Sequence, residues 1–444
     1  MKSNKIRKDV FFGSMGVVTI DLLQLVISVI IARALGPEGR GTYSLIVGFT
    51  GILSFLVGLN TASANSYLAG SRKFPLSDLL GGSIIMMFVT WLFAIIVGFL
   101  LVYFDAPFIR GINPNQLYFV LLVYPFALSQ NYFRGILIGT KNYVKTVRAD
   151  VTGFLLSVTT LSLCFLFGWI SLWAAVITWG LIAVTTTTMN LYSVTREIPN
   201  HLPSFNRKAL IEQIRYGARS YFAKTMTWVN NTSDIYIGAM FLTKAEIGYY
   251  VTAFGLANKL WIVPNSLGAS IVSRIAEAPD GKPQLLKLSS QITFFITLVL
   301  GFLLATFGYL IIYFLYSKKF SASYIPLLLM LPGIVFKSIS LLMMRQLQGT
   351  NRPTVTSTIA IVSAGTHLGL NFVFIPLFSF NGMAIASSVA SLLEFALLFY
   401  MIRKTTGYKL TELLFLDANA KAYLMSALKK YGQSNRYTRR FFSR

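Results

Sequence analysis

The sequence predicts an all-α integral membrane protein of about twelve transmembrane helices, and two observations support this. The 444 residues are 55% hydrophobic and only 12% charged, with a mean hydropathy of +0.64. A soluble globular protein carries about 25% charged residues. The chain also contains a series of apolar runs, each long enough to cross a bilayer, which takes about 20 helical residues. These features exclude a soluble enzyme.

The runs of spanning length follow one another along the whole chain. They are Val10–Leu35, Thr42–Leu68, Leu79–Phe104, Gln116–Ile138, Val151–Gly168, Ile170–Thr195, Gly217–Leu242, Ile247–Val272, Leu288–Tyr316, Tyr324–Leu347, Thr354–Phe378 and Met383–Ile402. The first run is too long for the core of a signal peptide and lacks a small-residue cleavage site. We therefore expect it to remain as the first span.

The positions of Lys and Arg predict how the chain is oriented, because cytoplasmic loops retain these residues. With the N-terminus inside, the inside segments hold 28 of the 39 Lys and Arg residues. The outside loops hold only six, among them Arg33 and Arg40. Both termini are therefore predicted to be cytoplasmic. The net charge of +24 marks sidedness and does not require a nucleic-acid partner.

The two halves of the chain share a weak internal repeat. Four residues near the first span recur 207 positions later, as the pairs Leu35/Leu242, Gly41/Gly248, Tyr43/Tyr250 and Gly48/Gly255. Several matches at one offset indicate a duplication. Since each half has six predicted spans, the halves enter the membrane from the same side and form a parallel repeat, with a cavity expected between them.

We therefore expect two six-helix bundles around a central cavity. The predicted limits are 1–195 for the N-terminal bundle and 217–403 for the C-terminal bundle. A cytoplasmic linker, 196–216, joins them, and a basic cytoplasmic tail, 404–444, follows. The linker contains an amphipathic segment, Phe205–Arg215, which is predicted to lie on the inner membrane surface.

The stretch Ile31–Leu45 reads IARALGPEGRGTYSL and directly follows a first span with a basic inner tail. It resembles the start of the bacterial polysaccharide transporters. These are oligosaccharide-lipid flippases of the multidrug/oligosaccharidyl-lipid/polysaccharide (MOP) exporter superfamily, which also contains the multidrug extruders and the lipid II flippase. The resemblance covers the whole chain. The lipid II flippase branch has two additional C-terminal spans, and the polar region after Ile402 disfavours that branch.

This resemblance implies a multi-pass transporter of the bacterial cytoplasmic membrane, not an enzyme. Its implied cargo is an undecaprenyl-pyrophosphate-linked oligosaccharide, moved from the inner to the outer leaflet by alternating access with proton or sodium coupling. Membrane lipids and polysaccharide-assembly proteins are its implied partners. The glycan, the carrier lipid, the coupling ion and the oligomeric state are left open.

Charged residues inside the predicted spans are the candidate functional residues, because an intramembrane charge is costly and needs a wet cavity or a partner. The predicted spans contain five cations and three acids. This surplus of positive charge favours an anionic ligand such as pyrophosphate. The predicted substrate-binding residues are Lys224, Lys259, Lys337, Asn231 and Trp228. The alternative is that the charges neutralise one another and fix helix packing. Arg134 and Arg345 are expected instead to reach the interface or to contact loops.

Two acids are candidates for ion coupling. Asp21 lies on a polar stripe of the first span, and Asp234 lies on a comparable stripe of the seventh. A buried Asp can have its pKa raised into the physiological range, which suits reversible binding of a proton. The alternative is that each pairs with a lysine and stays ionised.

Other chemistries lack the residues that they need. The single cysteine, Cys164, excludes an internal disulfide, and two distant histidines make a metal site unexpected. We expect no cofactor, and no phosphate-binding loop of the Gly-x-x-x-x-Gly-Lys-Ser/Thr type occurs. The alternative functions are a cation-coupled multidrug extruder, which should have an acidic or apolar cavity, and a membrane-embedded polysaccharide polymerase, which needs larger loops than these.

Overall fold

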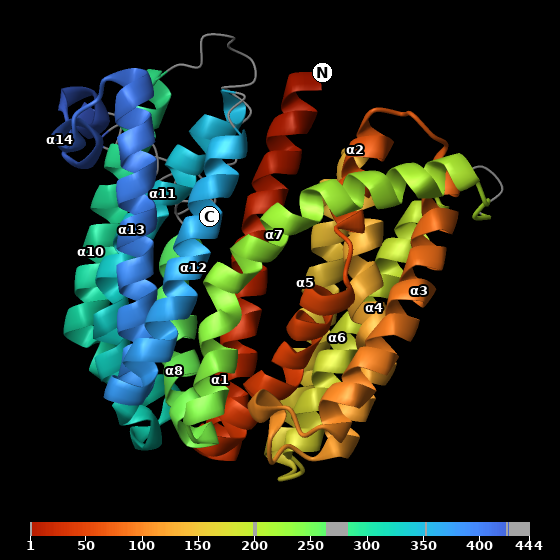
Figure 1. Cartoon of the computed structure of the whole chain (residues 1–444), viewed down its shortest axis with the longest axis horizontal. Helices are drawn as coiled ribbons and strands as arrows, with labels where there is room; N and C mark the ends of the chain where they lie inside the picture. Colours follow the sequence, from red (N-terminus) through yellow and green to blue (C-terminus); the bar gives the residue numbers. More distant parts are fainter. Residues whose placement is uncertain (1, 199–201, 263–282, 351–352, 423–424, 426–444) are drawn as a thin grey trace, which may run out of the picture. The chain divides into compact units, whose positions relative to one another are not determined.

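Within the residues that the computed structural model describes, every regular element is a helix (Figure 1). These residues are 2–198, 202–262, 283–350, 353–422 and 425. The long helices are α1 (Lys2–Val57), α3 (Leu76–Tyr103), α4 (Pro114–Gly139), α5 (Tyr143–Leu166), α6 (Leu172–Thr195), α7 (Arg207–Phe241), α10 (Pro283–Tyr316), α11 (Tyr324–Gly349), α12 (Pro353–Phe378) and α13 (Phe380–Thr406). The shorter elements are α2 (Thr61–Gly70), α8 (Lys244–Ala257), α14 (Leu410–Leu414) and the 3-10 turns η1 (Pro107–Ile109), η3 (Asn258–Trp261) and η4 (Lys318–Ser323). The predicted all-α class is confirmed.

Helix α1 contains the first predicted span and residues 42–57 of the second, which continues in α2 after a break at residues 58–60. Its backbone is non-helical at Gly36, where φ is 68° and ψ is −174°, and Pro37 follows. Glycine takes a positive φ without a steric penalty, and proline lacks the N–H that would continue the first helix. The turn is therefore tight, and Arg40, which was predicted to lie in an outside loop, is helical.

Eight of the described helices are long and apolar enough to cross a membrane. They are α1, α3, α5, α6, α10, α11 with η4, α12 and α13. Counting α1 as two spans and adding α4, α7 and α8 gives the twelve predicted spans. Helix α8 ends at Ala257, where η3 follows it, and residues 263–272 of its predicted span lie outside the described residues, as do residues 426–444 of the predicted tail. Helices α4 and α7 are not among the helices identified by their hydropathy.

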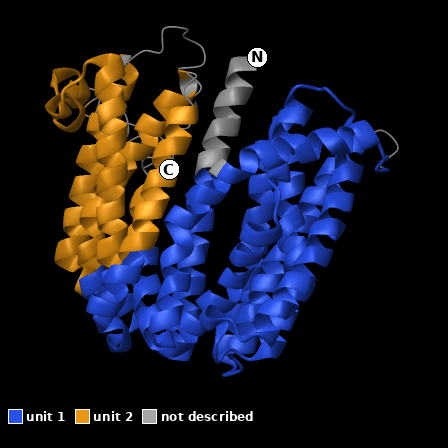
Figure 2. Cartoon of the chain, in the orientation of Figure 1, with its two compact units in different colours: residues 1–255, 310–326, 371–383 blue, residues 256–309, 327–370, 384–444 orange. Residues whose placement is uncertain are grey.

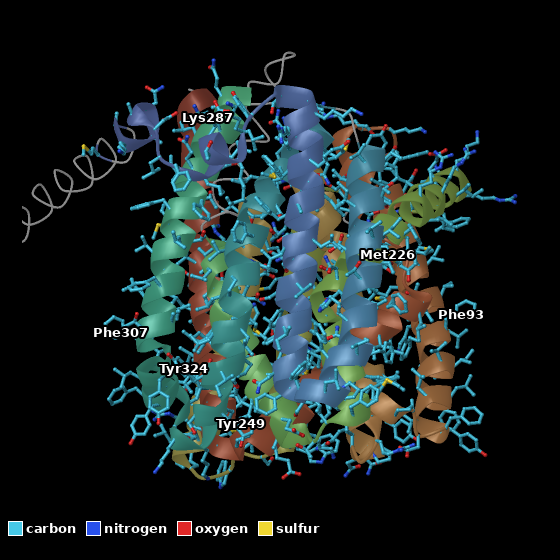
Figure 3. The ribbon with its side chains drawn as sticks, turned by 60° about the vertical axis from the view of Figure 1, so that its left-hand side comes forward. Phe93, Met226, Tyr249, Lys287, Phe307 and Tyr324 are labelled. Atoms are coloured by element: carbon cyan, nitrogen blue, oxygen red, sulfur yellow. The ribbon has the colours of Figure 1, made fainter. Side chains whose placement is uncertain are left out.

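Large apolar side chains cover the outer surfaces of these helices. On α3, Leu92 is 61% exposed and Phe93 is 55% exposed, and on α10 Phe302 is 70% exposed. Phe93 and Phe307 point away from the helices that carry them (Figure 3). Soluble proteins rarely expose contiguous apolar surface of this kind. The surface is suited to lipid, in agreement with a multi-pass membrane protein.

The chain forms two compact units (Figure 2). Unit 1 consists of Met1–Gly255, Leu310–Pro326 and Asn371–Met383, and unit 2 consists of Leu256–Tyr309, Leu327–Leu370 and Ala384–Arg444. These units group residues by packing, and their limits do not follow the predicted bundle limits. The division into bundles at 1–195 and 217–403 stays a prediction.

Inside unit 1, two glycines of the internal repeat make a reciprocal contact. A Cβ on Gly41 would lie 1.8 Å from the carbonyl oxygen of Lys244, and a Cβ on Gly248 would lie 1.9 Å from that of Pro37. Both pairs are related by the repeat, since Pro37 and Lys244 are separated by the same 207 positions as the two glycines. The backbones after the two turns therefore pack against each other in an equivalent way, as a duplicated chain would.

The linker packs on the N-terminal helices instead of lying free. Asp78 at the start of α3 accepts hydrogen bonds from Ser204 Oγ at 2.5 Å and Asn206 Nδ2 at 2.7 Å. Gln213 is fully buried, and its Nε2 donates to Asn65 Oδ1 at 2.6 Å. A Cβ on Gly82 would lie 2.0 Å from Gln213 Oε1, so this close approach requires glycine. The first turns of α7 are thereby fixed on α2 and α3 (Figure 1).

Unit 2 has its own apolar core, which holds the start of the tail. Leu413 of α14 is fully buried against residues of α10, α11 and α13. Beyond α14, Asp417 accepts from the backbone N–H of Ala420 at 2.9 Å and pairs with Lys287 Nζ at 3.0 Å. The Ala420 N–H and the Lys287 ammonium hold the pKa of the Asp417 carboxyl below its usual range.

The reciprocal glycine contact yields a stability prediction. Gly248→Ala should lower the free energy of unfolding by about 1–3 kcal/mol, because the added methyl group overlaps the Pro37 carbonyl. The measurement is the thermal unfolding midpoint of the purified protein in detergent.

Gly255→Ala is the matched control on the same helix, α8, because a Cβ at that position has no atom within 4 Å. It should unfold at or above the wild-type midpoint. Equal midpoints for Gly248→Ala and Gly255→Ala would contradict the tight contact.

Candidate functional site

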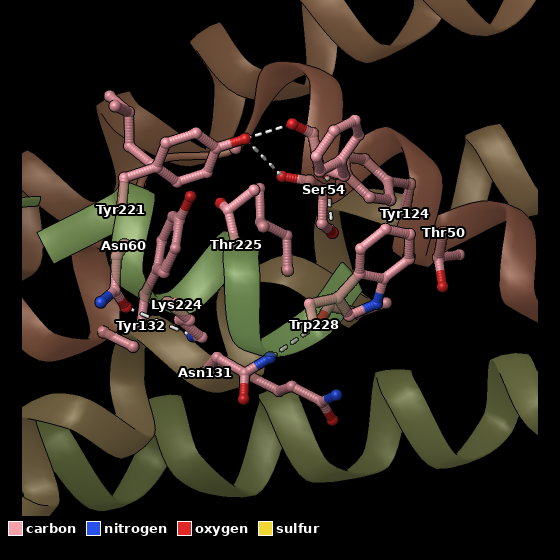
Figure 4. Close-up of a pocket in the computed structure, with 18 of the residues that line it drawn as sticks. Thr50, Ser54, Asn60, Tyr124, Asn131, Tyr132, Tyr221, Lys224, Thr225 and Trp228 are labelled. Atoms are coloured by element: carbon pink, nitrogen blue, oxygen red, sulfur yellow. Dashed lines mark hydrogen bonds between the residues drawn. The ribbon is translucent and has the colours of Figure 1, made fainter. Parts of the chain in front are cut away.

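A pocket of about 330 Å³ lies within unit 1, where α1 stops at Val57 and the chain continues to α2. It is termed the Lys224 pocket, and residues of α1, α4, α6 and α7 form its walls (Figure 4). The lining residues are Thr50, Gly51, Ser54, Phe55, Gly58, Leu59, Asn60, Ala62, Tyr124, Ala127, Leu128, Gln130, Asn131, Tyr132, Trp179, Tyr221, Lys224, Thr225 and Trp228.

Lys224 carries the charge of this pocket. Its side chain is exposed to the open space, and Nζ donates to Asn60 Oδ1 at 3.2 Å. Asn60 is positioned in turn, because its Nδ2 donates to Ser220 Oγ at 3.1 Å and its Oδ1 accepts from Ser63 Oγ. No carboxylate belongs to the described lining, and no ion pair of Lys224 occurs among the described residues.

Aromatic side chains of α7 form one wall of the pocket against α1. Trp228 stacks on Phe55 with ring centroids 5.4 Å apart and an interplanar angle of 22°. Tyr236, two turns further along, tilts against Trp228 at 5.6 Å and donates to the Gly48 carbonyl at 2.5 Å. The Tyr221 hydroxyl donates to the Phe55 carbonyl. These contacts hold α7 along α1 and present the indole of Trp228 to the pocket.

The opposite wall supplies neutral polar groups from α4. Tyr124 and Ser54 share a hydrogen bond at 3.2 Å, and the side-chain amides of Gln130 and Asn131 belong to the lining. Aromatic faces, amides and hydroxyls beside one ammonium group suit a ligand that has polar rings and negative charge.

A second pocket, of about 400 Å³, shares Gln130 and Trp179 with the first and is termed the Arg40 pocket. Its lining residues are Ile20, Gln24, Ile27, Ser28, Arg40, Tyr43, Gln130, Arg134, Asp150, Phe154, Trp179, Ile182 and Thr186. Arg134 forms an ion pair with Asp150 here. Asp150 is the last residue of the predicted inside segment 140–150, so this contact is compatible with the expectation that Arg134 reaches the interface or contacts a loop.

The acids predicted for coupling lie in different surroundings. Asp234 is only 1% exposed, and its carboxylate accepts from the Tyr250 hydroxyl and from the Ile235 N–H at 2.9 Å. Tyr250 is fully buried and is the repeat partner of Tyr43. Asp21 is half-buried on α1, and neither acid lines the two pockets.

The structure joins two of the predicted binding residues and separates the others from them. Lys224 and Trp228 share the Lys224 pocket, whereas Asn231 is half-buried on α7 outside its lining. Lys259 and Lys337 belong to unit 2, and the Lys337 ammonium lies 5.3 Å from the ring centroid of Trp261. The roles of Lys259, Lys337 and Asn231 stay predictions.

Several lining residues were not predicted from the sequence. Asn60, Tyr124 and Asn131 are common polar residues of apolar runs, and only tertiary packing brings them to Lys224. A usable signal existed for Asn60, because Gly58 interrupts the second predicted span just before it. Arg40 was missed because it was assigned to a loop.

Comparisons with known proteins agree with this architecture. The family model described as polysaccharide biosynthesis protein matches residues 6–268, more than half of the chain. No curated protein sequence matches. Among solved structures, the lipid II flippase MurJ in an inward closed conformation is similar, with a TM-score of 0.76, 15% identity and coverage of 91% of this chain and 89% of that chain.

Two transporters of the MOP superfamily are also similar in fold. One is an inward-facing multidrug resistance MATE family transporter, with a TM-score of 0.67, 14% identity and coverage of 88% of this chain and 96% of that chain. The other, from Pyrococcus furiosus, is described as having a binding pocket of reverse polarity, with a TM-score of 0.59, 15% identity and coverage of 88% and 94%.

Identities this low establish the shared fold, whereas the match over residues 6–268 establishes the family. The chain therefore belongs to the polysaccharide biosynthesis protein family and has the fold of the MOP-superfamily flippases and transporters.

Proposed function

We propose that this protein is a flippase for a lipid-linked oligosaccharide, moving an undecaprenyl-pyrophosphate-linked repeat unit from the inner to the outer leaflet by alternating access. The observation that carries this proposal is the Lys224 pocket. It offers one ammonium group that has no carboxylate partner in the described part of the chain, together with aromatic faces and amides. An ammonium group favours the pyrophosphate, and the neutral polar wall favours the sugars.

The charge of the pocket argues against the second candidate, a multidrug extruder of cationic compounds. The fold is compatible with both functions, since MATE transporters and a lipid flippase are similar to this chain. A cationic cargo would meet Lys224 with no acid in the described lining to offset it. Like charges in a poorly solvated site repel strongly. An anionic cargo is therefore the better match.

Ion coupling is the second part of the proposal, and Asp234 is its main candidate. A carboxylate buried beside α1 and α8 gains or loses a proton or sodium ion at a large electrostatic cost, so its occupancy can bias helix packing. The Tyr250 hydroxyl contacts this carboxylate from α8, and Tyr250 lies two residues beyond Gly248 of the reciprocal glycine contact. Asp21 stays the second candidate.

Lys224→Ala should reduce glycan export about tenfold or more, the usual consequence of losing a hydrogen bond to a charged group. The assay is complementation of a flippase-deficient bacterial strain, with the exported glycan measured at matched protein levels. Lys224→Arg should retain part of the export because it keeps the charge.

Arg219→Ala is the matched control, because Arg219 is an exposed cation five residues earlier on α7 and outside the pocket lining. It should export like the wild type. If the Lys224→Ala variant exports glycan as well as the wild type does, Lys224 does not contribute to substrate binding.

Asp234→Asn should make export insensitive to the ion gradient, since the amide keeps the size of the side chain and cannot exchange a cation. The measurement is transport in proteoliposomes before and after collapse of the proton and sodium gradients. Tyr250→Phe, which retains the carboxylate, should keep the gradient dependence. If the transport rate of the wild type does not change when both the proton and the sodium gradient are collapsed, coupling through Asp234 and Asp21 is excluded.

A further inference from the structure

The side chain of Arg40 is half-buried, and among the described residues it has no hydrogen-bond acceptor. Its Nε is buried and makes no hydrogen bond, and no hydrogen bond or ion pair of its side chain occurs among the described residues. Its neighbour is the ring of Tyr43, whose centroid lies 5.8 Å from the guanidinium carbon. A buried charge that lacks an acceptor destabilises the structure that holds it.

The acid nearest in the pocket lining does not neutralise Arg40. Asp150 is the only carboxylate of the described lining, and it is paired with Arg134. Two arginines and one aspartate leave the lining with one positive charge in excess. The remaining polar groups are neutral, and one of them, Gln130, is held by Thr186 Oγ1 at 2.6 Å. The Arg40 pocket therefore presents an unmatched cation to about 400 Å³ of space.

We propose that Arg40 binds the pyrophosphate of the transported lipid, an inference that rests on the proposed function. The guanidinium is a planar fork of N–H donors, which matches two oxygens of a phosphate and keeps its charge at any relevant pH. A pyrophosphate supplies the acceptors and the negative charge that the Arg40 pocket lacks. A neutral sugar supplies acceptors without that charge.

The position of the Arg40 pocket suits this role. It shares Gln130 and Trp179 with the Lys224 pocket, so the two are neighbours within unit 1. In a lipid-linked oligosaccharide the pyrophosphate is joined directly to the first sugar. The pyrophosphate is held by Arg40, with Lys224 as the second cation, while the sugars occupy the aromatic wall of the Lys224 pocket.

The test measures binding by the purified full-length protein in detergent. The probes are undecaprenyl pyrophosphate, the neutral alcohol undecaprenol and inorganic pyrophosphate, and the readout is the change in intrinsic tryptophan fluorescence. The wild type should bind undecaprenyl pyrophosphate at least about tenfold more tightly than undecaprenol. Arg40→Gln should lose that preference, and Arg40→Lys should keep part of it.

Arg110→Gln is the control, because Arg110 is an exposed arginine that pairs with Asp105 at 3.0 Å outside both pockets. It should bind like the wild type. The ligand-free thermal midpoint of Arg40→Gln should equal or exceed that of the wild type, because the substitution removes an unpaired buried charge. Loss of affinity together with a lowered midpoint would assign Arg40 to structure and overturn the proposal.

The remaining outcomes separate this proposal from the proposed function. If Arg40→Gln retains the wild-type preference, only the role of Arg40 is overturned. If the wild type does not distinguish the pyrophosphate lipid from the alcohol, the pyrophosphate-linked substrate and the role of Arg40 both fall. Inorganic pyrophosphate bound as tightly as the lipid would overturn the assignment to a lipid headgroup.

Discussion

Close packing of the backbones at Gly41 and Gly248 is the constraint on which unit 1 depends. Each glycine faces the carbonyl that precedes the other by four residues, so neither position has room for a side chain. The contact fixes the second part of α1 against α8. Helix α7 then follows α1 closely, with Tyr236 bonded to the Gly48 carbonyl and Trp228 packed beside Gly51. The aromatic wall of the Lys224 pocket is a consequence of this packing.

The buried charges of unit 1 divide into satisfied and unsatisfied groups. Arg134 pairs with Asp150, and Asp234 receives the Tyr250 hydroxyl. Among the described residues, Lys224 donates to the amide oxygen of Asn60 and Arg40 lies beside the ring of Tyr43, and neither pairs with an acid. A charged side chain that only stabilises the fold is expected to lie beside an opposite charge. Without such a partner, nothing offsets the free-energy cost of removing the charge from water. The two cations without an acid partner face pockets, so their missing charge is best supplied by a ligand.

The sequence was sufficient for the helical class and for the apolar helices, because both are properties of local composition. Apolar runs of spanning length correspond to helices, and the matches at Gly41 and Gly248 meet in a single contact. The site was predicted only in part. Lys224 and Trp228 lie one turn apart on α7, so one helical stripe brings them together. Asn60, on another segment, joins them through packing that no local pattern encodes.

Arg40 was placed wrongly because of the way in which cations were assigned. The prediction of orientation assigns each Lys and Arg to a loop or to a membrane span. In that assignment, residues at the ends of spans are treated as exposed to water. Arg40 lies in the first turn after a tight Gly-Pro break, where the chain is already helical and enclosed. Arg134 lies near the end of α4 and pairs with Asp150 on α5. Short connections bring span ends into contact, so proximity to a loop does not imply contact with water.

Hydropathy itself indicates which helices line the pockets. Among the described helices of 18 residues or more, α4 and α7 are the ones not apolar enough to be identified as membrane spans. These same two helices provide Tyr124, Gln130 and Asn131 on one wall and Lys224 and Trp228 on the other. A membrane helix gains by being apolar wherever it meets lipid, so a less apolar span must face protein or a hydrated space. In this chain, the two spans of reduced hydropathy are therefore both spans that line the Lys224 pocket.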